Sequence, residues 1–179
     1  MSDMRPSVLI ACNKSVRNTY LSTVELQRLE VFADWSWFAC EGGGIYEAQE
    51  DLEQSAALVE RLDGVDALVV CHGAPRLNAA MMDKKQGLKI VGELEGDRFA
   101  ARIDLDAAWQ HGIRVVDTTN GSSYPVAEWA LALILISLKQ AGAHFRRIIA
   151  GQTGRDANLV AKMSGVLKGK RVGLIGCGH

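Results

Sequence analysis

Short apolar runs of strand-forming residues alternate with segments of helical periodicity over the first part of this chain. The apolar runs lie at residues 8–12, 35–39, 65–70, 88–91 and 113–116, and the helix-compatible segments between them lie at residues 17–32, 47–62 and 76–86. Nearly continuous apolar strands are typical of a parallel sheet covered on both faces, because parallel neighbours need crossover helices between them. The sequence therefore predicts an α/β fold, with a flavodoxin-like parallel-sheet domain over residues 1–117.

A change of pattern follows this domain. Residues 118–123 are polar and turn-forming, and Pro125 then opens a long helical run that extends to about Ala150. Proline suits the first turn of a helix, where its missing N–H costs nothing. Residues 126–136 are apolar on almost all sides, which indicates a helix buried on most faces by packing between domains or subunits. We therefore expect a domain crossover, with residues 118–179 forming the start of a second domain.

The last segment resembles the opening of a Rossmann phosphate loop. A charged turn is followed by a short expected strand at residues 171–175 and by the Gly-x-Gly of Gly176 and Gly178. In such a loop the first glycine makes the tight turn and the second lets the backbone approach a pyrophosphate. The third glycine, the following helix and the acidic residue that reads the ribose do not occur before His179. We predict the truncated start of a dinucleotide-binding domain, with Gly176 and Gly178 as cofactor contacts.

Composition excludes several classes of function. Twenty basic and 21 acidic side chains give a net charge of -1, which disfavours nucleic acid and anionic membrane surfaces as partners. The apolar residues 126–138 include Glu128 and fall short of the roughly 20 residues of a membrane span. The N-terminus lacks a targeting pattern, so we expect a cytoplasmic protein.

The reactive side chains form no recognisable catalytic or metal-binding pattern. The four cysteines are scattered and read as buried reduced thiols, and no His/Cys/Asp/Glu group has metal-ligand spacing. No Ser/His/Asp or Cys/His arrangement can be built either. The sequence therefore predicts no metal site, and it argues against hydrolases and metalloenzymes.

Several motifs occur in an order that is specific in combination. They are Leu88–Val91, Ile103–Ala108, Gly112–Ile113, Val115–Val116, Thr118, Val126–Leu133, Leu167–Lys170 and Gly173–Gly178. From about Gly64 to His179 the chain resembles the D-isomer-specific 2-hydroxyacid dehydrogenase family. The resemblance implies an NAD- or NADP-dependent oxidoreductase that transfers hydride between nicotinamide and a small 2-hydroxy or 2-keto acid. It also implies a homodimer formed through residues 125–150.

The resemblance also implies roles for individual residues. Val126 matches the family valine that touches the nicotinamide ring, and Thr118 matches the threonine near the cleft. Glu95 and Gly96 lie in the loop whose backbone amides bind the substrate, and Ser122 replaces an asparagine found near the substrate in several members. The family's catalytic histidine, arginine and glutamate belong to the half beyond His179. We therefore predict no catalytic residue here, and we expect the chain to be inactive by itself.

Two features leave alternatives open. The substrate loop carries Glu93, Glu95 and Asp97, which would repel an anionic substrate unless the side chains turn away or Arg98 offsets them. His72 follows the third expected strand at the edge where parallel sheets place ligands, so it is either a substrate contact or an ordinary loop histidine. The alternative function is a non-catalytic flavodoxin-like module for ligand binding or dimerisation.

Overall fold

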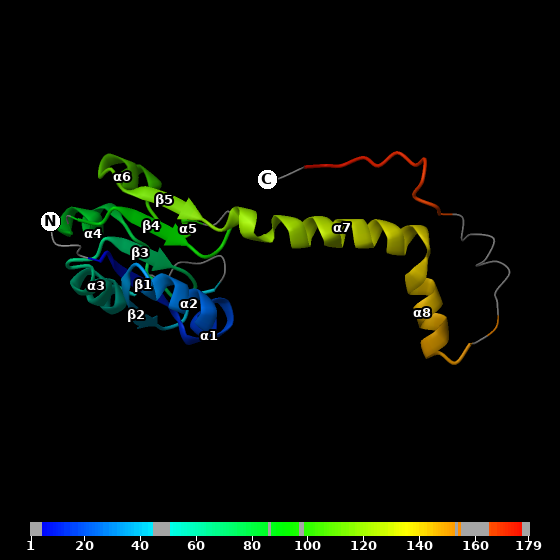
Figure 1. Cartoon of the computed structure of the whole chain (residues 1–179), viewed down its shortest axis with the longest axis horizontal. Helices are drawn as coiled ribbons and strands as arrows, with labels where there is room; N and C mark the ends of the chain where they lie inside the picture. The colour runs from blue at the N-terminus through cyan, green and yellow to red at the C-terminus, as the bar shows by residue number, and fades with distance from the viewer. Residues whose placement is uncertain are drawn as a thin grey trace. The chain divides into compact units, whose positions relative to one another are not determined.

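A computed structural model describes residues 5–44, 51–85, 87–96, 99–152, 154 and 165–176 of the chain. The backbone divides into two compact units, Met1–Thr119 and Asn120–His179. The first unit contains a five-stranded sheet, and the second contains two helices (Figure 1).

The five strands of the first unit are parallel and follow the order β2-β1-β3-β4-β5. They are β1 (Ser7–Asn13), β2 (Asp34–Cys40), β3 (Ala67–Val70), β4 (Ile90–Glu93) and β5 (Arg114–Asp117). Each apolar run in the sequence gives one strand, and this order is that of flavodoxin-like sheets. The predicted α/β fold with a parallel sheet is therefore confirmed.

Side-chain caps determine where the helices between the strands begin. The helices of this unit are α1 (Lys14–Tyr20), α2 (Thr23–Glu30), α3 (Leu52–Arg61), α4 (Ala79–Lys84), α5 (Phe99–Arg102) and α6 (Leu105–Gln110). Asn13, Ser22, Asp51, Asn78 and Asp104 each accept a hydrogen bond from a backbone N–H in the first turn of a helix. The single segment expected over residues 17–32 is two helices, because Ser22 caps a new helix.

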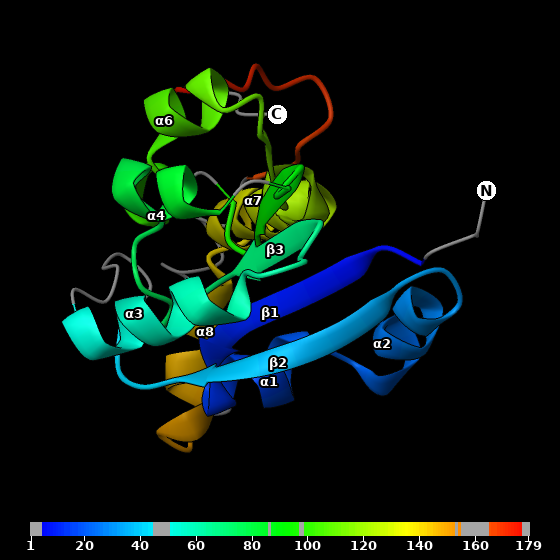
Figure 2. The same cartoon turned by 90° about the vertical axis from the view of Figure 1, so that its left-hand side faces the viewer.

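The sheet separates two apolar clusters. Helices α3, α4 and α6 cover one face, where Leu58, Met82 and Ala108 pack against Leu68 and Val91 of the strands. Helices α1 and α2 cover the other face over β1 and β2 (Figure 2), through Val16, Leu26 and Leu29. Alternate strand residues enter opposite clusters, as Leu9 and Ile10 of β1 do, so burial on both faces explains the continuous apolar runs.

The second unit begins with a short 3-10 helix, η1 (Thr119–Ser122), and continues as α7 (Ser123–Leu138) and α8 (Ala141–Ile149). Pro125 lies in the first turn of α7, where its missing N–H is tolerated. The single helix predicted to run to Ala150 is wrong, because Gln140 adopts a left-handed backbone conformation with φ of 51° and separates α7 from α8.

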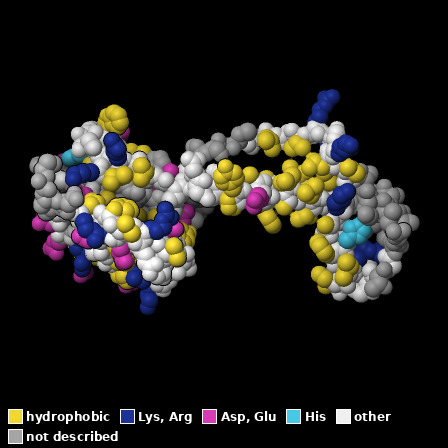
Figure 3. All heavy atoms as spheres, viewed as in Figure 1, with side chains coloured by type: hydrophobic (Ala, Val, Ile, Leu, Met, Phe, Trp, Pro, Cys, Tyr) yellow, Lys and Arg dark blue, Asp and Glu magenta, His cyan; other side chains and the backbone are white. Residues whose placement is uncertain are grey.

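Apolar side chains line α7 without being buried in this chain. Val126, Trp129, Leu131 and Leu133 are all exposed, and hydrophobic side chains lie along the visible face of the helix (Figure 3). The helical stretch Thr119–Leu138 has 20 residues and is long and apolar enough to cross a membrane by length and composition. Core helices of soluble proteins meet the same criteria, so the expectation that residues 126–138 do not form a membrane span stays a prediction.

The segment 165–176 forms no regular element, although a strand was predicted at residues 171–175. Ile175 and Leu174 are exposed. A strand is stabilised by backbone hydrogen bonds to a neighbour, and the five described strands all pair within the other unit. The strand prediction is wrong for this chain, because the residues have no described strand beside them.

Two glycine-containing loops approach each other closely at the carboxyl ends of β2 and β3. Gly73 has φ of 88°, and a Cβ atom there would lie 2.9 Å from the carbonyl oxygen of Gly42 and 3.0 Å from Cβ of Asn13. Gly43 is equally restricted, since its Cβ would lie 2.6 Å from the backbone nitrogen of Gly73. Only glycine allows these loops to meet, and their contact shapes this edge of the sheet.

Replacing Gly73 with alanine should therefore destabilise the protein more than the same change at Gly64. Gly64 also has a positive φ of 70°, but a Cβ there would meet no atom within 4 Å. We expect Gly64→Ala to lower the free energy of unfolding by about 1–2 kcal/mol from backbone strain alone. Gly73→Ala should cost about 1–3 kcal/mol more from steric overlap. Urea denaturation of both variants measures the difference, and equal losses would show that the two loops are not tightly packed.

Candidate functional site

Polar side chains gather at the carboxyl edge of the sheet. Because all five strands are parallel, their carboxyl ends meet along this edge, and in such folds ligands bind where the strand order reverses. Here that point lies between β1 and β3, where the backbone N–H of Asn13 donates to the carbonyl oxygen of His72 at 2.7 Å. The position of His72 at this edge was predicted from the sequence.

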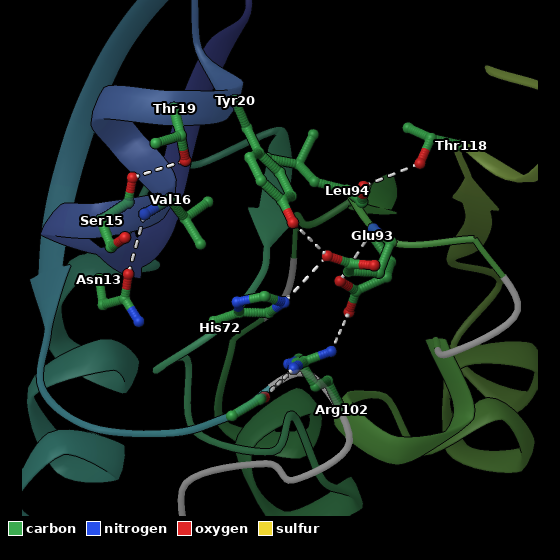
Figure 4. A network of polar contacts seen from close by, with 12 residues as sticks. Asn13, Ser15, Val16, Thr19, Tyr20, His72, Glu93, Leu94, Arg102 and Thr118 are labelled. Carbon is green, nitrogen blue, oxygen red and sulfur yellow. Dashed lines mark hydrogen bonds and ion pairs between the residues drawn. The ribbon is translucent and has the colours of Figure 1, made fainter. Parts of the chain in front are cut away.

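Glu95 is the centre of a hydrogen-bonded group from three parts of the unit, which includes His72 and Tyr20. Figure 4 shows the side chains of Tyr20 and His72 converging on this group. The Oε1 atom of Glu95 lies 2.9 Å from Nε2 of His72 and accepts a hydrogen bond of 2.8 Å from the hydroxyl of Tyr20. The rings of Tyr20 and His72 also meet edge to face, with centroids 5.9 Å apart. The His72 and Glu95 side chains are only 17% and 11% exposed, so the pair is largely shielded from water.

A buried ion pair lies beneath this group. Nη1 of Arg102 is 3.4 Å from Oε2 of Glu93, and both side chains are 0% exposed. Nη2 of Arg102 donates at 2.6 Å to the carbonyl oxygen of Gly44 in the loop after β2. The Arg102 carbonyl oxygen accepts a hydrogen bond of 2.8 Å from the backbone N–H of Leu77. One arginine therefore connects the segments that follow β2, β3 and β4.

The environment of Glu93 and Cys71 changes their ionisation. Burial raises the pKa of the Glu93 carboxyl to about 7, and the Arg102 guanidinium opposes this shift. Burial likewise raises the pKa of the Cys71 thiol to about 12, so this thiol is protonated at neutral pH in the protein by itself. Both groups lie beside the His72–Glu95 pair, which makes this edge rich in titratable groups.

The acidic loop does not present its carboxylates freely to an anion. Glu93 faces Arg102, and Glu95 faces His72 and Tyr20, so both side chains turn into contacts within the protein. Arg102 pairs with Glu93, whereas the sequence suggested Arg98 as the offsetting cation. Arg98 and Asp97 lie outside the described residues. The repulsion expected from this loop is therefore reduced by its own pairing.

The backbone of the same loop is also constrained. The N–H of Glu95 donates to Oε1 of Glu93 at 3.2 Å, so a side chain of this protein contacts an amide expected to bind substrate. Gly96 passes close to the segment after β5, because a Cβ there would lie 2.8 Å from Cα of Thr119. The hydroxyl of Thr118 donates to the carbonyl oxygen of Leu94 at 2.8 Å. Gly96 and Thr118 thus join the ends of β4 and β5.

The remaining predicted site residues belong to the second unit. Ser122 precedes α7 as its N-cap and makes no side-chain capping bond, and Val126 is exposed on the helix. Gly176 has the positive φ of 78° that a tight glycine turn uses. Gly178 lies outside the described residues. Among the described residues, no strand precedes Gly176, and the assignment of Gly176 and Gly178 to cofactor contacts stays a prediction.

Sequence reasoning missed Tyr20, Arg102 and the proximity of Cys71 to the site. Tyr20 ends α1, and Arg102 ends the four-residue helix α5, just before the motif Ile103–Ala108 that carries the family resemblance. The register of the strands is the signal that could have placed Cys71 near the site. Strands β3 and β4 pair with Val70 opposite Glu93. The residues after those two strands must then lie side by side.

These features define a parallel α/β domain with a polar ligand-binding edge, and comparisons with known proteins identify its family. Residues 22–166 match the family model of the D-isomer specific 2-hydroxyacid dehydrogenase catalytic domain. The chain belongs to the D-isomer specific 2-hydroxyacid dehydrogenase family, which is a family of oxidoreductases acting on CH–OH donors. The family resemblance found in the sequence is thus confirmed.

The chain covers only part of the length of its individual relatives. The D-3-phosphoglycerate dehydrogenase of Bacillus subtilis (strain 168) is 29% identical over 120 residues, which are 67% of this chain and 22% of that protein. A phosphoglycerate oxidoreductase from Rhizobium etli superposes with a TM-score of 0.63 at 16% identity, covering 91% of this chain and 45% of that one. An NAD-complexed D-isomer specific 2-hydroxyacid dehydrogenase from Lactobacillus delbrueckii ssp. bulgaricus gives 0.56 at 15% identity, covering 86% and 42%. The chain therefore spans less than half the length of these proteins.

Replacing Arg102 with methionine should destabilise the first unit strongly, because Glu93 would then be buried without its partner. We expect a loss of about 3–5 kcal/mol in the free energy of unfolding. Arg28→Met removes the partner of Glu25 in an exposed ion pair and should cost less than about 1 kcal/mol. The double variant Glu93→Leu/Arg102→Met should recover much of the loss. Chemical denaturation provides the measurement, and similar losses for Arg102→Met and Arg28→Met would contradict a structural role for the buried pair.

Proposed function

We propose that this chain supplies the substrate-binding part of an NAD- or NADP-dependent oxidoreductase of the D-2-hydroxyacid dehydrogenase type. The observation that carries the proposal is the family match over residues 22–166, which includes the carboxyl edge of the sheet. The polar group at that edge supports it, because a small acid needs a few hydrogen-bond donors placed in a shielded site. The substrate would be a 2-hydroxy or 2-keto acid.

His72 and the loop at Glu95 and Gly96 are the proposed substrate contacts. The imidazole of His72 remains partly exposed while Glu95 and the Tyr20 ring hold its orientation. A histidine held in this way can donate a hydrogen bond to a substrate oxygen. We also propose that Ser122 contacts the substrate through its hydroxyl.

We propose a nicotinamide cofactor for the whole protein. Nicotinamide would accept or donate the hydride, and the NAD-complexed relative from Lactobacillus delbrueckii supports this choice of cofactor. Thr118, Val126, Gly176 and Gly178 are the residues of this chain that we assign to cofactor contacts. The reaction also needs catalytic groups that we do not assign to any residue of this chain. We therefore infer that the chain does not catalyse hydride transfer alone, and that the complete protein works in the cytoplasm.

A second proposal concerns the apolar helix α7. Its exposed residues include Val126, Trp129, Leu131 and Leu133, and contiguous apolar surface of this kind is usually covered by a partner. We propose that the chain forms a homodimer through α7 and α8. The same surface would serve the alternative function, which is a non-catalytic module that binds ligands or dimerises. This alternative differs from the leading proposal because such a module would bind no 2-keto acid.

Acid binding by the 179-residue chain tests the leading proposal. We expect glyoxylate, pyruvate or 2-oxoglutarate, titrated in the presence of EDTA, to shift the backbone NMR signals of His72, Glu95 and Gly96. His72→Gln should weaken binding about 10- to 100-fold, because a hydrogen bond to a charged group is lost. His111→Gln is the matched control, since His111 contacts Ala107 and Asp83 on another part of the unit. Oxidation of NADH by the chain alone should stay at the background rate.

Two outcomes would contradict this proposal. If no 2-keto acid shifts these signals, the edge of the sheet is not the substrate site and the non-catalytic module is favoured. If His72→Gln and His111→Gln weaken binding equally, His72 is not a specific contact.

Sedimentation equilibrium tests the homodimer. The chain should associate in a concentration-dependent manner, and Leu133→Glu on α7 should weaken the association at least tenfold by placing a charge in the apolar contact. Leu52→Glu, on an exposed position of α3, introduces the same charge elsewhere and should have no effect. A chain that is monomeric at high concentration, or that floats with phosphatidylcholine vesicles instead of dimerising, would contradict the homodimer.

A further inference from the structure

We propose that Cys71, His72 and Glu95 form a zinc-binding site at the carboxyl ends of β3 and β4. The thiol sulfur, an imidazole nitrogen and a carboxylate oxygen of these residues all lie within 4.8 Å of one another. This juxtaposition of three different ligand types occurs in a largely shielded location, since Cys71 is buried and the other two side chains are mostly covered. The site shares His72 and Glu95 with the proposed substrate contacts, but metal binding is tested with the ion alone and without any 2-keto acid.

The pairing of two neighbouring strands brings these residues together. Strands β3 and β4 are parallel with Val70 opposite Glu93, and the N–H of Leu94 continues the ladder by donating to the Val70 carbonyl oxygen at 3.1 Å. Two positions further along this register, His72 lies beside Glu95. Metal-ligand spacing was not visible in the sequence, because His72 and Glu95 are 23 positions apart and follow different strands. The prediction of no metal site therefore depended on local spacing alone.

The geometry requires only a small adjustment to accept the ion. In tetrahedral zinc sites, bonds of roughly 2.0–2.3 Å place neighbouring ligand atoms roughly 3.3–3.8 Å apart. The Nε2 atom of His72 and Oε1 of Glu95 are 2.9 Å apart, which is a hydrogen-bond distance. Replacement of the shared proton by zinc would separate these two atoms by a few tenths of an ångström and draw the Cys71 sulfur inward.

The donor set and its charge favour zinc among the common cations. Sulfur, nitrogen and oxygen ligands together suit zinc, whereas calcium and magnesium require oxygen ligands. A Cys71 thiolate and a Glu95 carboxylate neutralise the charge of one Zn²⁺, and the neighbouring Glu93 is already paired with Arg102. Three protein ligands leave a fourth position for water or an oxygen of a bound molecule.

Contacts around the ligands support the same assignment. The Tyr20 hydroxyl donates to Glu95 at 2.8 Å, and the Tyr20 ring meets the imidazole of His72 edge to face. Partners of this kind fix the orientation of metal ligands, and their loss typically weakens metal binding 10- to 100-fold. Tyr20 would therefore be a positioning residue for the site.

Cobalt substitution provides the decisive experiment, because a thiolate bound to Co²⁺ gives a charge-transfer absorption that oxygen and nitrogen ligands alone do not. The 179-residue chain is prepared with Cys177→Ser and His179→Gln, which remove another thiol and imidazole near each other in the sequence. We expect one equivalent of Co²⁺ to produce the charge-transfer band and one equivalent of Zn²⁺ to abolish it. Competition with a chromophoric chelator then gives the zinc affinity.

Matched variants identify the ligands. Cys71→Ser should remove the charge-transfer band and weaken zinc binding at least 100-fold, and His72→Gln and Glu95→Gln should weaken it at least tenfold. Tyr20→Phe should weaken it about tenfold or more while keeping the band. Cys12→Ser is the control, because Cys12 is buried in the same apolar cluster as Cys71, and it should change neither quantity.

Several results would overturn the proposal. They are the absence of a charge-transfer band, a band that persists in Cys71→Ser, and equal losses in Cys71→Ser and Cys12→Ser. If Cys71→Ser does not fold by circular dichroism, His72→Gln and Tyr20→Phe decide the question, since both change partly exposed side chains. Unaltered zinc affinity in those two variants would then reject the site.

Discussion

The buried contact between Arg102 and Glu93 is the constraint on which the carboxyl edge of the sheet depends. Arg102 neutralises a carboxylate at the end of β4 and also holds the carbonyl oxygen of Gly44 after β2. Glu93 in turn accepts the N–H of Glu95 and so determines the path of the loop that carries the candidate site. A charge buried this deeply requires its partner. The geometry around His72 and Glu95 therefore depends on an ion pair that contacts no solvent.

This arrangement changes how the carboxylates of the acidic loop would act on an anionic substrate. Considered as a sequence, Glu93 and Glu95 argue against an anionic substrate, because like charges repel. In the structure, one carboxylate is paired with a guanidinium and the other with an imidazole and a phenol. The loop therefore has less negative potential than its composition indicates.

The strands could be predicted from the sequence because each is a short apolar run, and the central strand β1 is buried on both faces. The helices were predicted less accurately, since Ser22 and Gln140 divide runs that look continuous in periodicity. The strand expected at residues 171–175 depended on a neighbour that the described residues do not provide. Within the site, His72 was found from its position after a strand and Glu95 from the family resemblance, whereas Arg102 and Tyr20 become relevant only through tertiary contacts.

The exposure of helix α7 and the irregular backbone of residues 165–176 have the same physical cause. A helix that is apolar on all sides lowers its free energy only when other surfaces cover it, and a strand forms only beside another strand. Neither condition is met by the described residues of the second unit, where Trp129 and Ile175 are exposed. The first unit, by contrast, buries both faces of β1 and β3 with its own helices. Stability in this chain is therefore concentrated in the sheet, and the site at its edge depends on contacts within the first unit alone.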